Sequence, residues 1–224
     1  MKRYLSALIL GAGGIAILMS LGFWQVRRLA WKEGVIAAIE AKIGDEPAAF
    51  DGIAGPDPER DQYRPVTATG RIGQAYLRIL SGQKYVGSGY RIISPFIVGD
   101  RTVMIDRGFV AEDEGPPPMH AAPVTITGNL LWPQDADSYT PAPDLAKNIW
   151  FARDVEAMAG ALHAEPVLIV GRDGPDDRPV TPDPVDTASI PNDHRQYAIT
   201  WFSLAGVWAG MTAFLLWRIR QRTN

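Results

Sequence analysis

Two long apolar stretches enclose a polar middle in this chain. Residues 4–26 and 197–217 contain no charged side chain, whereas charges are frequent between them. At 1.5 Å per residue, a helix made from either stretch crosses a hydrocarbon core of about 30 Å. Tyr197, Trp201 and Trp217 stand at the ends of the second stretch, as interfacial aromatic residues prefer. The pattern therefore predicts transmembrane helices at 4–26 and 197–217.

A secretory signal is the alternative for the first stretch, because Lys2 and Arg3 resemble a basic n-region. The apolar core of a signal runs for only about 7 to 15 residues, so we expect an uncleaved anchor. Apolar residues then recur at helical spacing beyond the span, at Trp31, Val35, Ile36, Ile39 and Ile43. This periodicity predicts that the helix continues out of the membrane as an amphipathic segment until Gly44 and Pro47.

Short β-rich runs, separated by breaks rich in Gly or Pro, fill most of the middle. They lie at 66–72, 76–80, 91–98, 102–110 and 124–131, with a sixth at 166–170. Asp154 can cap a short helix that runs through Leu162. Residues 45–61 are typical of a surface loop, and 171–191 of a linker that returns to the membrane. The fold class expected is an α+β membrane protein, in which two transmembrane helices flank one extracytoplasmic domain, mainly an antiparallel sheet or small barrel with short helices.

The distribution of charge indicates the orientation. All 25 carboxylates lie between Leu29 and Asp193, and this acidic middle argues against nucleic-acid binding. Basic residues at both chain ends favour cytoplasmic termini: Lys2, Arg3, Arg218, Arg220 and Arg222. Basic residues at the opposite membrane edge weaken this argument: Arg27, Arg28, Lys32 and Arg195. The expected organisation is a cytoplasmic N-terminus at 1–3, a periplasmic β-rich domain at 27–196 and a cytoplasmic tail at 218–224, around the two spans.

The expected compartment is the inner membrane of a bacterium. No Arg-rich, Ser-rich transit peptide precedes the first span, so a bacterial location is preferred over a mitochondrial one. The chain contains no cysteine, which excludes disulfides, thiolate metal sites and cysteine nucleophiles. No nucleophile elbow, His-Glu zinc motif or phosphate-binding glycine loop occurs, so an enzyme is not expected.

The run from Asn192 to Phe202 is the strongest candidate for chemistry, because it places an imidazole at the outer edge of the second span. On a helix, His194, Tyr197, Ala198 and Trp201 share one stripe. A neutral imidazole is a usual axial ligand of haem iron, and nearby arginines could neutralise the haem propionates. The alternative is that His194 only caps the helix or lies in the interface, and that the aromatics form an ordinary membrane belt. His120 and His163 lack the spacing of metal ligands.

Two other features have plain structural explanations. Small residues spaced by four, such as Gly206 with Gly210, predict close helix packing, either between the two spans or against another subunit, with the internal contact favoured. Asp106 and Arg107 beside Gly108 could form a charged active-site pair. A salt bridge that ends a strand is the preferred interpretation.

An ordered set of motifs resembles the surfeit locus protein 1 family, the assembly factors of haem-copper cytochrome c oxidase. The motifs are Trp24-Gln25 with Arg27 and Arg28, Tyr63-Arg64-Pro65-Val66 with Gly70, Gly87-Ser88-Gly89-Tyr90, Ile105 to Val110, and Asn192, His194, Tyr197, Ala198 and Thr200-Trp201. The family usually has Asn-Arg-Gly-Trp where this chain has Asp106 to Phe109, and an apolar residue is common at the position of Arg195. The histidine is unaffected by these departures.

The resemblance implies a non-catalytic role in the maturation of oxidase subunit I, with haem a as a transiently bound cofactor. The family's histidine corresponds to His194, as metal ligand, and its following tryptophan to Trp201. Further candidate contacts to the cofactor are Tyr197, Arg195, Arg28, Trp24 and Gln25. The implied partners are subunit I, possibly haem a synthase, and membrane lipid. The main alternative is a haem-free membrane scaffold that stabilises an oxidase assembly intermediate; a two-span sensor is the third hypothesis, and the short tail after the second span offers it no output domain.

Overall fold

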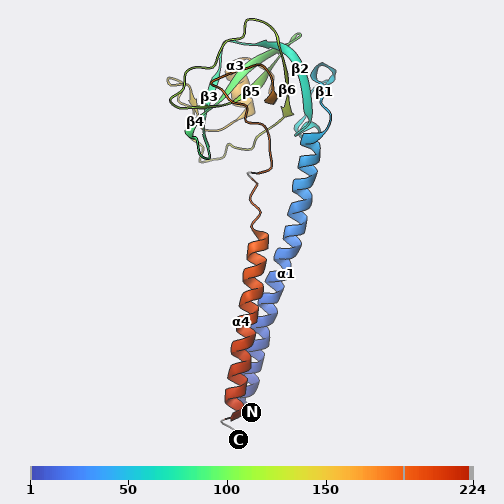
Figure 1. The fold of residues 1–224 in the computed structure, drawn as a ribbon, viewed down its shortest axis with the longest axis vertical. Helices are drawn as coiled ribbons and strands as arrows, with labels where there is room; N and C mark the ends of the chain where they lie inside the picture. The colour runs from blue at the N-terminus through green and yellow to red at the C-terminus, as the bar shows by residue number, and fades with distance from the viewer. Residues whose placement is uncertain (1, 189, 222–224) are drawn as a thin grey trace. The chain divides into compact units, whose positions relative to one another are not determined.

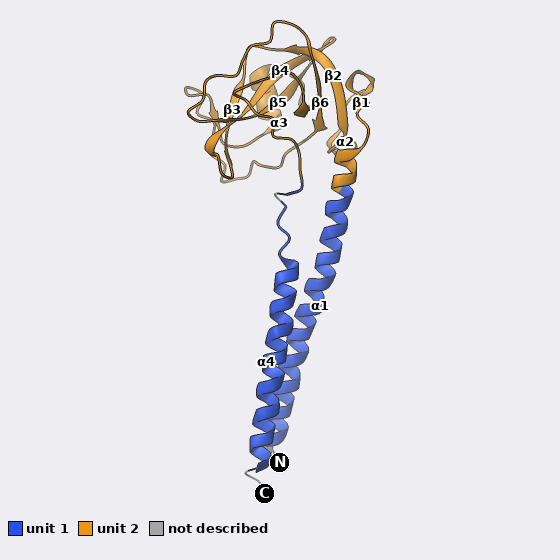
Figure 2. Cartoon of the chain, in the orientation of Figure 1, with its two compact units in different colours: residues 1–38, 187–224 blue, residues 39–186 orange. Residues whose placement is uncertain are grey.

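The computed structural model describes residues 2–188 and 190–221. The chain forms two compact units, one made of residues 39–186 and the other of residues 1–38 together with 187–224 (Figure 2). The helix unit, unit 1 of the figure, contains the two apolar stretches, and the barrel unit, unit 2, contains the β-rich part of the sequence.

Two long helices make up the helix unit. α1 spans Lys2–Gly44 without a break, so the predicted continuation of the first span to Gly44 is confirmed. α4 spans His194–Gln221 and begins three residues before the predicted span. Both helices are long and apolar enough to cross a membrane. They run antiparallel, so the N-terminal end of α1 and the C-terminal end of α4 lie together (Figure 1).

Glycines on α1 receive the bulky side chains of α4. A Cβ atom on Gly22 would lie 2.6 Å from the Phe202 ring, while Gly14 lies under Trp208 and Gly11 under Thr212. The indole Nε1 of Trp208 also donates to the carbonyl of Gly11 at 3.2 Å. Small residues permit this close approach of two helices, because they add no side-chain bulk between the backbones.

The internal packing favoured for Gly206 and Gly210 is wrong. Both residues are exposed on α4, and a Cβ atom built on either meets no other atom within 4 Å. Ala198 and Ala205, seven residues apart, are the buried positions of α4 instead. Since seven residues complete nearly two helical turns, these alanines share a face, and that face is a different one from the face of Gly206 and Gly210.

Five strands of the barrel unit close into a barrel (Figure 1). These strands are β2 (Pro65–Ile72), β4 (Gly87–Val98), β5 (Arg101–Ala111), β6 (Val124–Leu130) and β8 (Leu168–Asp173). Neighbours around the barrel are β2, β4, β5, β8 and β6, and all pairs are antiparallel except β5 with β8. Numbered along the chain, the closed order is 1-2-3-5-4, which is the arrangement of the OB-fold, a five-stranded Greek-key barrel.

Shorter elements complete this unit. β3 (Leu77–Gln83) extends the sheet beyond β4, β7 (Ile149–Trp150) pairs with β3, and β1 (Ala48–Ala49) pairs with β2. The helical pieces are η1 (Phe50–Gly52), α2 (Pro58–Asp61) and α3 (Val155–Leu162). The Asp154 side chain accepts a hydrogen bond from the amide of Ala157, so the predicted cap of α3 is confirmed. The predicted α+β class, with two apolar helices flanking a mainly antiparallel β domain, is also confirmed.

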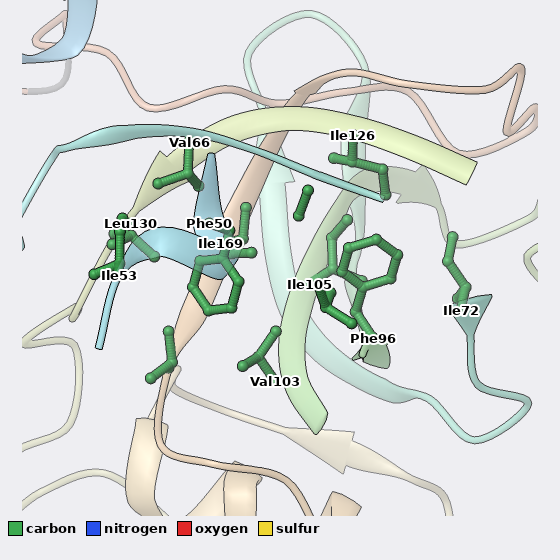
Figure 3. Packing of buried hydrophobic residues seen from close by; sticks show 13 residues of the cluster. Phe50, Ile53, Val66, Ile72, Phe96, Val103, Ile105, Ile126, Leu130 and Ile169 are labelled. Atoms are coloured by element: carbon green, nitrogen blue, oxygen red, sulfur yellow. The ribbon is translucent and has the colours of Figure 1, made fainter. Parts of the chain in front are cut away.

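All five barrel strands contribute apolar side chains to one interior cluster. Figure 3 shows members such as Val66, Phe96, Ile105, Ile126 and Ile169 directed toward one another, with Phe50 from η1 among them. A second cluster lies on the outside of the barrel, where α3 covers Met104 and Leu168. β5 is therefore buried on both faces, which explains its nearly continuous apolar sequence.

Candidate functional site

His194 is the first residue of α4 and lies at the end of the helix pair opposite to the chain termini. Pro191 precedes it by three residues, and the backbone amide of Tyr197 donates to the carbonyl of Asp193, which closes the first turn. The imidazole is half-buried. An apolar helix thus begins with the one histidine that the sequence singled out as a metal ligand.

Gln25 of α1 binds this histidine. The Nδ1 atom of His194 lies 2.7 Å from the side-chain oxygen Oε1 of Gln25, although 169 positions separate the two residues in the sequence. Gln25 is buried, with only 8% of its surface exposed. The structure thus brings together two residues that the motifs of the two spans had indicated separately.

The two helices also meet through an aromatic pair about two turns along α4 from His194. The rings of Phe23 and Phe202 meet edge to face, with their centres 5.4 Å apart. Phe202 also fills the space above Gly22. The sequence motifs did not single out this pair, and the uninterrupted apolar pattern around both residues contains no signal that would have found it.

The remaining candidate residues surround the contact between Gln25 and His194. Trp201 is half-buried on α4, two turns from His194, whereas Tyr197 is 54% exposed and lies outside the packed face. On α1, Trp24 is 55% exposed, and Arg28 stacks its guanidinium 3.9 Å above the ring of Trp31. Arg195 is exposed beside His194. Within the stripe expected from helical spacing, Ala198 is buried, His194 and Trp201 are half-buried, and Tyr197 is exposed.

A single imidazole suits a haem iron, because the porphyrin supplies the equatorial ligands. Among the residues that the structure describes, no group of three or more His, Asp or Glu side chains could hold a bare metal ion. A haem iron needs only an axial ligand from the protein, and one imidazole supplies it. The apolar surroundings and the exposed arginines also fit an amphiphilic macrocycle with two carboxylates. The residues present thus fit a haem better than a free ion.

The other two histidines have structural roles in the barrel unit. The Nε2 atom of His120 lies 2.6 Å from Asp177, which also accepts two hydrogen bonds from Arg107. Arg107 donates further to the carbonyl of Pro118. These bonds hold the loop around His120 and the segment around Asp177 to β5. His163 caps α3 in the left-handed conformation, with φ at 53°.

The ion pair expected between Asp106 and Arg107 is wrong. The two residues lie inside β5, where successive side chains point to opposite faces, so they have different partners. Asp106 is fully buried, accepts from Nε of Arg91 at 2.7 Å and from the amide of Gly108 at 3.0 Å. Burial raises the pKa of this carboxyl, and the Arg91 guanidinium opposes the rise.

Gly108 permits the linker to bind at this point. Its φ is 119°, and a Cβ atom there would collide with the backbone of Thr181. Phe109 and Thr181 exchange backbone hydrogen bonds of 2.8 Å, and Arg91 binds Asp183 further along. Residues 177–183, expected to belong to a free linker, are thus attached to the barrel. The segment from Asp106 to Phe109 is therefore the place where residues 177–183 attach to the barrel.

The similarity to known proteins covers both helices of the candidate site and the barrel between them. The model of the SURF1 family matches residues 12–206, which include Gln25, the barrel and His194. A SURF1-like protein of Monosiga brevicollis is 30% identical over 220 residues, covering 89% of this chain and 83% of the relative. A Surfeit locus protein 1 of Xenopus tropicalis is 29% identical and covers 83% of this chain and 67% of the relative. A SURF1-like protein of the bacterium Rickettsia felis is 29% identical and covers 84% and 87%.

Proposed function

This chain belongs to the SURF1 family, whose members are known generally as cytochrome oxidase assembly factors, and from this premise we propose that it binds haem a and assists its insertion into subunit I of a haem-copper cytochrome c oxidase. The role is non-catalytic. The haem is held only transiently, at the outer edge of a bacterial inner membrane.

One observation carries the proposal: a half-buried imidazole stands at the end of an apolar helix pair and is held by a buried glutamine. Haem, when bound, supplies an iron that takes a neutral imidazole as axial ligand. His194 would be that ligand. Trp201 would offer a flat apolar surface two turns further along α4, and Tyr197 and Trp24 would add aromatic surface beside it. Burial of the apolar macrocycle against these residues and lipid would supply much of the affinity.

Arginines at the same end of the helices suit the carboxylates of a haem. Arg195 is exposed beside His194, and Arg28 lies on α1 one turn beyond Gln25. A guanidinium can bind a propionate through two parallel hydrogen bonds, which orients the ligand as well as neutralising it. Apolar contacts toward the membrane and charged contacts toward water would thus hold the haem in one orientation.

The proposed location follows from the two apolar helices and the charges at their ends. Arg218 and Arg220 occupy the last turn of α4, and basic residues near a span favour the cytoplasmic side. Both termini would then be cytoplasmic, with the barrel in the periplasm. The partners would be subunit I, a haem a synthase as donor, and the surrounding lipid.

The test is to compare the haem content of purified variants. In cells that make haem a, we expect His194→Ala to lose at least about 10-fold of the Soret absorbance per protein, Trp201→Leu to lose part of it, and Arg195→Ala to lose least, because Arg28 can still bind a propionate. His163→Asn is the matched control, since asparagine tolerates the left-handed cap. Unchanged occupancy and spectrum in His194→Ala would refute the ligand assignment and favour a haem-free scaffold.

A further inference from the structure

We infer that Gln25 is a positioning residue for His194: its side-chain carbonyl holds the imidazole in the tautomer protonated at Nδ1 and so presents Nε2 as the ligand atom. The part concerning haem rests on the proposed function. The tautomer itself is a property of the haem-free chain and can be measured there.

The hydrogen bond between Gln25 and His194 fixes the position of the imidazole proton. An amide oxygen can only accept, so a contact of 2.7 Å between Oε1 of Gln25 and Nδ1 of His194 requires the proton on Nδ1. A neutral imidazole carries one such proton, which leaves Nε2 with a free lone pair. Of the two ring nitrogens of His194, only Nδ1 has a hydrogen-bond partner among the residues that the structure describes. In the neutral imidazole, Nε2 is therefore available as a ligand atom.

The same hydrogen bond fixes the direction of Nε2. The N–H bond of Nδ1 and the lone pair of Nε2 point to nearly opposite sides of the ring, so fixing Nδ1 on Gln25 turns Nε2 away from α1. The half-burial of His194 is consistent with a ring that has one edge packed and the other open. An unbound histidine at a helix end would instead rotate and populate both tautomers, only one of which suits a given pose of the iron.

The packing of α1 against α4 explains why Gln25 points toward His194. Gln25 follows Leu18 by seven residues and Gly22 by three, so it lies on the face of α1 that packs against α4. An amide buried on such a face costs free energy unless it is hydrogen-bonded. Trp24, its neighbour, is 55% exposed and points elsewhere. Packing therefore aims Gln25 at His194, and the hydrogen bond offsets the burial of the amide.

The expected energetic consequence is known from other metal sites. A histidine ligand nearly always donates its other ring proton to a carbonyl or carboxylate, and loss of that partner typically lowers metal affinity about 10- to 100-fold. Gln25→Leu keeps a similar volume on the packed face but removes the acceptor. We expect it to weaken haem binding about 10-fold or more while His194 remains in place.

The experiment reads the tautomer directly in the haem-free full chain in detergent micelles. With ¹⁵N-labelled histidine, long-range ¹H–¹⁵N correlation above pH 8 distinguishes the two tautomers, and the chain contains only three histidines. His194→Ala assigns the signal. We expect the Nδ1-protonated pattern in the wild type and a mixture of tautomers in Gln25→Leu. Gln196→Leu makes the same change at an exposed glutamine two residues from His194 and should leave the pattern unaltered.

The outcomes separate this inference from the proposed function. A wild-type His194 protonated at Nε2, or a tautomer that Gln25→Leu leaves unchanged, would overturn the role of Gln25 even if haem still bound. The expected tautomer in a wild-type chain that takes up no haem would support the role of Gln25 and refute haem binding. A haem titration of the same three samples gives the second readout, in which Gln25→Leu should be weakened and Gln196→Leu should match the wild type.

Discussion

The barrel and the helix pair bury opposite kinds of side chain. The barrel encloses large apolar residues such as Phe96, Ile105 and Leu130, each at most 1% exposed. The helix pair leaves Leu10 and Met211 more than 60% exposed, and the positions it buries are small or polar. Water drives large apolar groups into the interior of the barrel, whereas lipid is as apolar as leucine and gives no such drive. This is the difference expected for a barrel in water and a helix pair in lipid.

Polar groups are also handled differently in the two units. The barrel buries the charges of Asp106 and Arg107, each with an oppositely charged partner. In the helix pair, the buried polar residue is the uncharged Gln25, and it binds an imidazole. A neutral contact suits helices in lipid, because an unpaired charge there would be costly. The candidate site thus lies where the helix pair departs from its otherwise apolar interface.

The largest effect is expected from breaking the buried ion pair of the barrel. Asp106→Asn leaves Arg91, whose side chain is 13% exposed, without its main carboxylate partner. We expect a loss of about 3 kcal/mol in the free energy of unfolding, measured by denaturant titration of the full chain. Asp176→Asn removes an exposed partner of Arg178 and should cause no measurable change. Equal effects of the two variants would contradict the structural role given to Asp106.

A smaller effect is expected from filling one of the close contacts of the helix pair, at Gly22. Gly22→Leu places a side chain where Phe202 packs, and such overpacking costs about 2 kcal/mol. The chain has no cysteine, so a disulfide between Leu18→Cys and Ala205→Cys can report whether the helices still meet. We expect cross-linking to fall in Gly22→Leu. Gly206→Leu adds the same bulk at an exposed position and should leave cross-linking unchanged.

The smallest effect is a pH dependence of the barrel's stability that the helix pair should not share. Hydrogen bonds from Arg60 chiefly, with others from Asp57 and Arg64, lower the pKa of Asp61 to about 2. A carboxyl whose folded pKa is depressed stabilises the fold above its unfolded pKa, near 4, and loses that contribution as pH falls toward 2. Asp61→Asn should therefore cost the barrel about 1 kcal/mol at pH 6, and this difference should shrink between pH 4 and pH 2. α4 contains no carboxylate, so its helicity should not follow this change.

Local patterns were sufficient to predict the elements of this protein. Runs of uncharged residues predicted both long helices, and the helical spacing of residues after Trp31 predicted that α1 continues to Gly44. Alternating apolar residues between Gly and Pro predicted the strands of the barrel, although β1 and β7, with two residues each, were too short to be recognised. Such predictions succeed because helical and strand periodicities depend only on near neighbours.

Only the tertiary structure decided which distant residues meet. The closure of β2 on β4, the parallel pairing of β5 with β8, and the attachment of Asp177 to Arg107 depend on packing between segments that no local pattern links. The same is true of the glycines, because Gly22 and Gly206 look alike in the sequence and only one faces the other helix. The sequence by itself indicated that His194 stands at the edge of a span. The antiparallel packing of α1 on α4 brought Gln25 within 2.7 Å of it, since the register of two helices is set by the sum of their contacts and not by either helix alone.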